Sequence, residues 1–131
     1  MESVISLAPN RESVLIAQKF IEEHLDKLSV STEVRGDINI SFDEIYSNIV
    51  NYSTATKASI SWESDDDSIT ITFTDNGNAF NPLDKIDPDV TLDIEHRQIG
   101  GLGIYFVKNM MEEVSYIREN ELNILTIKKS L

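Results

Sequence analysis

The sequence lacks cysteine and has few cationic residues. Without cysteine there is no disulfide framework, no thiolate nucleophile and no thiolate metal site. Only 11 Lys and Arg residues stand against 23 Asp and Glu residues, which gives a net charge of -12. Because phosphate backbones and anionic lipids attract basic surfaces, this charge disfavours nucleic acid and membranes as partners. A small anionic ligand would need local neutralisation by backbone N–H groups or by a divalent cation.

Long apolar runs are also missing. No segment approaches the roughly 18 consecutive apolar residues that can span a bilayer. Residues 1 to 4 do not begin a basic segment followed by an apolar one, as a secretory signal would. We therefore expect a soluble protein of the cytoplasm. The 131 residues suit one domain, which would bury roughly two-thirds of the surface that the unfolded chain exposes.

Hydrophobic periodicity predicts elements in the order β-α-α-β-β-α-β-β. Alternating apolar and polar residues predict strands over residues 2 to 7, 57 to 63, 68 to 74, 113 to 119 and 122 to 128. Apolar residues at helical spacing predict helices over about residues 11 to 28, 38 to 53 and 101 to 111. Asn10 is the expected cap of the first helix, and Ser31 or Thr32 is a candidate cap for an earlier start of the second. Gly36 and Asn39 disfavour that earlier start because both are weak helix formers.

The many hairpins favour an α+β fold. We expect a two-layer α/β sandwich, in which a mixed and mainly antiparallel sheet carries its helices on one face. Residues 77 to 99 show no clear periodicity but contain Pro82 and Pro88. A stretch of that length inside a compact domain is usually functional or mobile. This segment is therefore a candidate lid over a ligand.

The second predicted helix carries a polar stripe beside its apolar one. At about 100 degrees per residue, the residues on this narrow face are Ser41, Glu44, Asn48 and Asn51. A solvated flank is the plain explanation, but such a flank favours Lys, Glu or Gln, whereas Asn is a poor helix former. The carbonyl oxygen of Asn48 suits Mg²⁺, which prefers hard oxygen ligands. One turn earlier, the Glu44 carboxylate could accept a proton from an attacking hydroxyl or water.

Asp75, Asn76 and Gly77 follow the third predicted strand. All three residue types are common in turns, so a plain turn is one explanation. The other is a binding role. The Asp75 carboxylate at a strand end could accept a hydrogen bond from an exocyclic amine, and Gly77 would let a flat base approach the backbone.

A glycine-rich segment, Gly100-Gly101-Leu102-Gly103, opens the third predicted helix. Its amides would face outward at a helix N-terminus, where anions bind readily. The segment matches neither common phosphate-binding signature. A P-loop needs a Lys followed by Ser or Thr, and the dinucleotide fingerprint needs glycine where Phe106 stands.

In this order the three motifs resemble those of the GHKL ATP-binding family, the Bergerat fold of gyrase and the histidine kinases. Within that family the chain looks most like the small anti-sigma factor serine/threonine kinases. The strings DEIYSNIVNYS, FTDNGNAFNP and GGLGIYFVKNMM are similar to the three boxes of that branch. The resemblance covers almost the whole chain and implies one ATP-binding kinase domain over residues 1 to 131, with Mg²⁺ as a cofactor.

The resemblance also implies a role for each motif residue. Glu44 would be the general base, Asn48 the Mg²⁺ ligand and Asp75 the reader of adenine, with Gly77 beside it. Residues 77 to 100 would form an ATP lid. The remaining nucleotide contacts would be Asn51, Arg97, Gly101, Leu102 and Gly103.

Two positions depart from the family pattern. Tyr52 stands where many relatives carry His, four residues after the helix Asn. Some relatives place an arginine close to the second glycine box to contact the terminal phosphates. Here the nearest is Arg97, four residues before Gly101.

Members of the resembled branch use ATP to phosphorylate a Ser or Thr of a small anti-anti-sigma (STAS-type) partner. They bind a sigma factor when that partner is modified, and they usually form homodimers. The same partners and a homodimer are therefore expected here.

Other functions remain as alternatives. An adaptor that binds ATP and a partner without transferring phosphate would have no need of Glu44, so this residue favours an enzyme. An interaction domain with accidental motifs is a further alternative. A histidine kinase is disfavoured because the chain has no room for a phosphoacceptor helical hairpin. Of the two histidines, His24 is expected on a helix surface and His96 is given no catalytic role.

Overall fold

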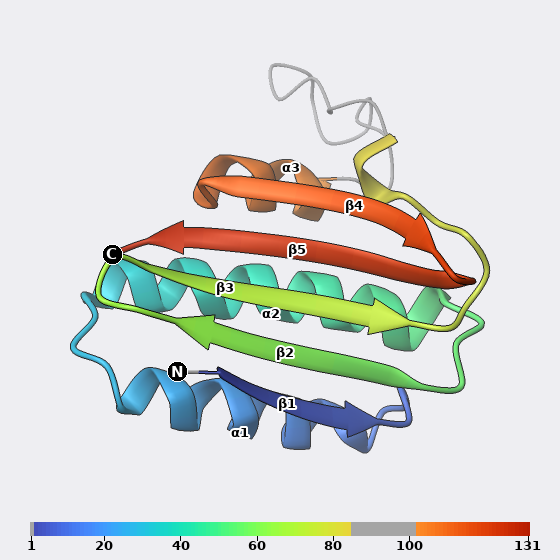
Figure 1. The fold of residues 1–131 in the computed structure, drawn as a ribbon, viewed down its shortest axis with the longest axis horizontal. Coiled ribbons are helices and arrows are strands. Elements are labelled where there is room, and N and C mark those ends of the chain that lie inside the picture. The colour runs from blue at the N-terminus through green and yellow to red at the C-terminus, as the bar shows by residue number, and fades with distance from the viewer. Residues whose placement is uncertain (1, 85–101) are drawn as a thin grey trace.

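The computed structural model describes residues 2–84 and 102–131, which build one sheet with helices behind it (Figure 1). The elements are β1 (Glu2–Leu7), α1 (Ser13–Asp26), α2 (Thr32–Tyr52), β2 (Ala58–Ser64), β3 (Ser68–Asp75), η1 (Pro82–Asp84), α3 (Leu102–Met110), β4 (Glu113–Glu119) and β5 (Leu122–Ser130). This is the predicted order, with a short 3₁₀ turn added after β3.

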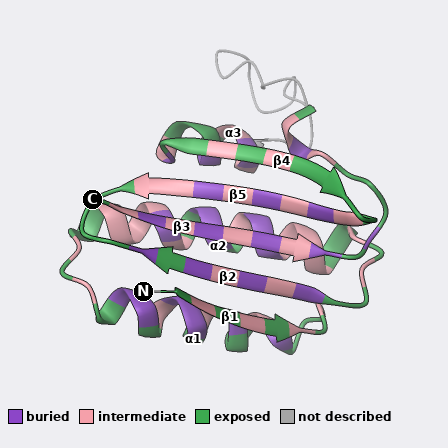
Figure 2. Ribbon diagram, in the orientation of Figure 1, coloured by how far each residue is buried: buried purple, intermediate pink, exposed green. Residues whose placement is uncertain are grey.

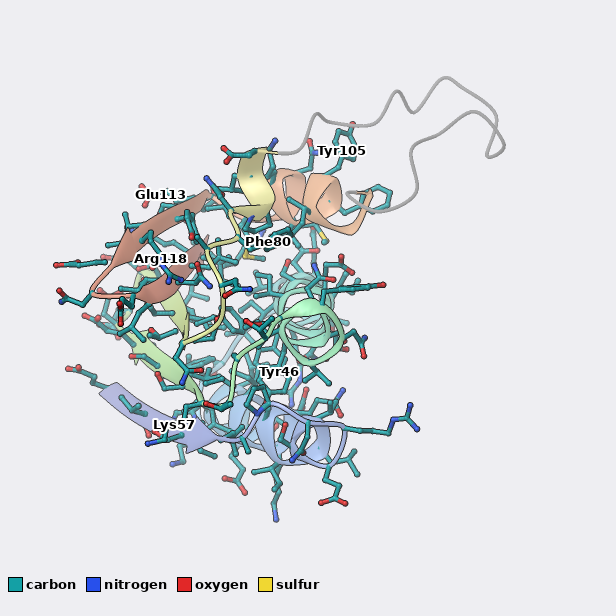
Figure 3. The ribbon with its side chains drawn as sticks, turned by 90° about the vertical axis from the view of Figure 1, so that its right-hand side faces the viewer. Tyr46, Lys57, Phe80, Tyr105, Glu113 and Arg118 are labelled. Atoms are coloured by element: carbon teal, nitrogen blue, oxygen red, sulfur yellow. The ribbon has the colours of Figure 1, made fainter. Side chains whose placement is uncertain are left out.

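The sheet has the strand order β1-β2-β3-β5-β4, and each neighbouring pair is antiparallel. The expected mixed sheet therefore contains only antiparallel pairs among the described residues. Seen from the side, the helices form a second layer on one face of the sheet (Figure 3). The predicted α+β sandwich is confirmed.

The core lies between the sheet and the helices because the strands alternate. Along β2 and β3 every second residue is buried, and Figure 2 shows the resulting stripes. The largest buried side chains are Trp62, Tyr46, Phe42 and Phe73. The Phe42 ring on α2 lies 5.6 Å from the Phe73 ring on β3, measured between centroids. Packing of the apolar face of α2 on the sheet thus sets which side of that helix is left for the polar stripe.

The helix starts follow local capping. Asn10 Oδ1 accepts from the Ser13 backbone amide at 2.9 Å, and the Asn10 amide donates to Ser13 Oγ at 3.2 Å. This reciprocal pair closes a turn just before the helix. Regular α1 begins at Ser13 with Glu12 at the N-cap position, so Asn10 is not the N-cap that the sequence predicted. At α2, Ser31 Oγ accepts from the Val34 amide at 3.1 Å, so the helix includes Gly36 and starts earlier than residue 38.

The expectation that His24 lies on a helix surface is wrong. Its side chain is 6% exposed, between the rings of Phe20 and Trp62. His24 Nδ1 lies 2.7 Å from the Phe20 carbonyl oxygen, so it is the protonated nitrogen and donates there. The buried face of α1 is wider than the apolar stripe suggested, and this bond satisfies the polar ring on that face.

The predicted lid lies partly within the described residues. After Gly77 the chain continues to η1 at Pro82–Asp84, and residues 85–101 lie outside the described part.

The hairpin between β4 and β5 is tight and lies at the predicted turn. Its two turn residues, Asn120 and Glu121, have φ of 52° and 65°. No helix in the described ranges is long and apolar enough to cross a membrane.

Candidate functional site

A cavity of about 220 Å³ opens between α2, α3 and the ends of β3 and β5. Its walls are largely apolar, and the apolar lining includes Ile45, Ile49, Phe73, Phe80, Ile104 and Leu125. Asp75 is the one charged residue in the described lining. In Figure 3 this end of the molecule faces the viewer. A largely apolar cavity of this size with one carboxylate suits a flat heterocycle that carries a hydrogen-bond donor.

Helix α2 places the polar stripe at the edge of this cavity. Asn48 lines it, and Asn48 Nδ2 donates to Glu44 Oε1 at 3.4 Å. Glu44 is half-buried and lies one turn away, outside the lining. Asn51 is exposed and does not line the cavity. The structure thus brings Glu44 and Asn48 together and leaves Asn51 apart from them.

The first turn of α3 lies against Glu44. A Cβ atom added at Gly103 would meet the carboxylate atoms of Glu44 at 2.0 to 2.4 Å, so only glycine allows this approach. Ile104, the next residue, lines the cavity. Of the other predicted contacts on this side, Leu102 begins α3, whereas Gly101 and Arg97 lie outside the described residues.

Asp75 ends β3 and is 7% exposed. Three donors converge on Asp75 Oδ1: the Gly77 amide at 2.9 Å, Asn123 Nδ2 at 3.0 Å and Ser53 Oγ at 3.4 Å. Within the described residues, no hydrogen bond is made to Oδ2. Because the protein uses one carboxylate oxygen, the other is left to accept from a ligand.

The turn after Asp75 is held from two sides. The Asn78 amide donates to Thr54 Oγ1 at 2.8 Å, and Arg118 Nη1 donates to the Gly77 carbonyl at 2.7 Å. A Cβ atom added at Gly77 would lie 2.3 Å from Ser53 Oγ. Glycine is therefore required here because the chain approaches Ser53 closely, whether or not a flat base also lies against this backbone.

Sequence reasoning missed Asn123, Tyr116 and Phe80. All three line the cavity, and Asn123 is only 6% exposed. A signal for Asn123 was present. On β5 it falls in phase with Leu125 and Ile127, so a polar residue occupies an inward position of an otherwise apolar strand face. Nothing local pointed to Tyr116 or Phe80, because their place at the cavity depends on distant pairing.

A comparison with known protein families identifies the family of the chain. A family model described as histidine kinase-like ATPase domain matches residues 7–129, which is nearly the whole chain. No curated protein sequence matches.

Proposed function

We propose that this chain, which belongs to the histidine kinase-like ATPase domain family, is an ATP-dependent protein serine/threonine kinase. The observation that carries the proposal is the place of Glu44. Its carboxylate lies beside Asn48 and against the first turn of α3, at the edge of the cavity that Asp75 lines. The largely apolar cavity and a carboxylate that can accept a proton therefore lie side by side.

The cavity would take the adenine ring. Its apolar walls suit the two faces of a purine, and Asp75 Oδ2, which has no hydrogen bond from the described residues, would accept from the exocyclic amine. The volume of about 220 Å³ fits a base better than a whole nucleotide. The sugar and phosphates would then extend past Asn48 toward α3, where the helix N-terminus favours negative charge.

The residues beside the cavity fit a magnesium ion. Asn48 turns its NH₂ group toward Glu44, and its Oδ1 has no hydrogen-bond partner among the described residues. Magnesium usually takes one or two protein oxygens and fills its remaining positions with water and phosphate. Asn48 Oδ1 would be such a ligand. When bound, the ion would offset phosphate charge that the acidic chain repels.

Glu44 would act as the general base. It would accept the proton of a Ser or Thr hydroxyl as that oxygen forms a bond to the γ-phosphorus of ATP. The bond from this phosphorus to the bridging oxygen breaks, and ADP leaves with the electron pair. By the sequence resemblance, the hydroxyl belongs to a small anti-anti-sigma partner of the STAS type. The same protein, as a cytoplasmic homodimer, would sequester a sigma factor.

The test is transfer of label from γ-labelled ATP to small anti-anti-sigma-type proteins. Glu44→Gln should keep ATP binding by calorimetry but lower the transfer rate by about 10² to 10⁴-fold, the usual contribution of a general base. Glu33→Gln is the matched control, because Glu33 is an exposed carboxylate in the first turn of the same helix. Full activity of Glu44→Gln would contradict the base role.

A wild-type protein that binds ATP but labels no such partner would instead support the ATP-gated adaptor.

A further inference from the structure

Asn123 uses every polar atom of its side chain. Its Nδ2 donates to Asp75 Oδ1 at 3.0 Å and to the Asn78 carbonyl at 2.9 Å. Its Oδ1 accepts from the Phe80 amide at 3.2 Å and from the Tyr116 hydroxyl. One buried amide therefore joins β3, β4, β5 and the segment after β3.

The partners fix the orientation of this amide. The two atoms near Nδ2 are a carboxylate oxygen and a carbonyl oxygen, which can only accept. The group near Oδ1 on the backbone side is the Phe80 N–H, which can only donate. A flipped amide would place oxygen against oxygen and N–H against N–H. Asn123 thus presents a donor to Asp75 in a single orientation.

This orientation fixes what Asp75 offers to a ligand. Protein donors already bond Asp75 Oδ1, so this oxygen is not available to a ligand. What remains is a single acceptor, Oδ2. A base must then bring a donor, as a 6-amino purine does. In the same pose a 6-oxo purine would set its O6 acceptor against Oδ2 and leave both oxygens unpaired.

We propose that Asn123 is a positioning residue that sets the selectivity of the cavity for a 6-amino purine over a 6-oxo purine. The inference rests on the proposed ATP-binding function. Asn123 acts through Asp75 and, by holding the Phe80 amide, also places the half-exposed Phe80 ring at the cavity edge. Strand β5 thereby contributes to base recognition through a residue that has no hydrogen-bonding atom left for the ligand.

The selectivity is measured as the ratio of dissociation constants for ITP and ATP, each with Mg²⁺. The wild type should bind ATP roughly tenfold or more tightly than ITP. Asn123→Leu has a similar size but no hydrogen-bonding atoms, and its ratio should fall at least about threefold below that of the wild type, because only Gly77 and Ser53 still donate to Oδ1. Asn123→Thr keeps one hydroxyl that can donate to Asp75, so its ratio should lie between those of the wild type and Asn123→Leu.

The matched control is Thr126→Val. Thr126 lies on the same strand, where its hydroxyl is 3.4 Å from the Thr72 hydroxyl, at a register position out of phase with Asn123. This variant should keep the wild-type ratio. Thermal unfolding of all variants separates selectivity from loss of fold.

A second measurement needs no substitution. Both side-chain amide protons of Asn123 should exchange slowly with solvent in the nucleotide-free wild type, because both are buried and bonded. Exchange as fast as that of an exposed Asn would overturn the proposal. A folded Asn123→Leu protein that keeps the wild-type ITP/ATP ratio would also overturn the proposal. The proposed ATP-binding function would not be affected by that result. A wild type that binds neither nucleotide would overturn both.

Discussion

At the scale of single residues, the most unusual atom in the core is the Ser41 hydroxyl oxygen. Ser41 is fully buried, and its Oγ is the one buried side-chain polar atom in the described ranges that has no hydrogen-bond partner. It belongs to the predicted polar stripe of α2, one turn before Glu44. An unpaired buried hydroxyl lowers stability, since it loses its water without gaining a partner.

Ser41→Ala should therefore stabilise the protein. We expect the free energy of unfolding to rise by roughly 0.5 to 1 kcal/mol in urea denaturation at pH 7. Ser13→Ala is the opposing control, because Ser13 Oγ bonds both the Asn10 carbonyl and the Tyr46 hydroxyl. That control should destabilise. A loss of stability in Ser41→Ala would mean that its hydroxyl has a partner, such as a buried water.

Gly103 permits a second residue-scale prediction. In Gly103→Ala the new Cβ would displace the Glu44 carboxylate, the mobile end of a flexible side chain, so the fold should persist. Phosphate transfer should fall by roughly tenfold or more, because the base is moved from its place. Gly36→Ala is the matched control, since nothing lies within 4 Å of its added Cβ. It should gain about 1 kcal/mol of stability and keep full transfer.

If Gly103→Ala transfers phosphate at the wild-type rate, the contact between α3 and Glu44 has no part in catalysis.

At the scale of elements, α1 and α2 are joined by a buried hydrogen bond. The Tyr46 hydroxyl lies 2.6 Å from Ser13 Oγ, and burial raises the pKa of Tyr46 above its ordinary value of 10.0. Since the folded state holds this proton more tightly than the unfolded state, the stability from Tyr46 is complete below pH 10.0 and is lost as the pH rises through the raised pKa.

Tyr46→Phe should therefore cost about 1 kcal/mol at pH 7, and this difference from the wild type should shrink above pH 10. The measurement is urea denaturation at pH 7 and pH 10.5 for both proteins. Tyr52→Phe serves as the control, because Tyr52 is 79% exposed and its substitution should leave both values unchanged. A difference that stays constant across this range would show that Tyr46 does not titrate with unfolding.

The start of α2 shows why element boundaries are hard to predict. Gly36 and Asn39 are weak helix formers, and they led to a predicted start near residue 38. The observed helix begins at Thr32, because the Ser31 cap and a tertiary contact compensate. In that contact Arg35 reaches back to α1, where it pairs with Glu22 and with Asp26 at 2.6 Å. Propensity is local, whereas this compensation comes from another helix.

At the scale of the whole molecule, the fold class and family were accessible from sequence because their signals are local. Strand alternation and the three ordered motifs lie in short windows, and the match to the histidine kinase-like ATPase domain family over residues 7–129 agrees with them. The anti-sigma branch, its partners and Mg²⁺ stay predictions. Strand order was not accessible, because β3 pairs with β5 across the chain. The contact between Asn123 and Asp75 could therefore not be predicted from the sequence.

The place of β5 between β3 and β4 has a consequence for synthesis on the ribosome. Of the described strands it is made last, yet it lies between β3 and β4. Until residues 122–130 have emerged, β3 presents an open edge with unpaired backbone groups, and β4 has no neighbour. The nascent chain must keep that edge from pairing with other chains, and Asp75 acquires its donor from Asn123 only when β5 is added. The Asn123 hydrogen bond to Asp75, and with it the selectivity that we propose for the cavity, therefore arises only after β5 has been made.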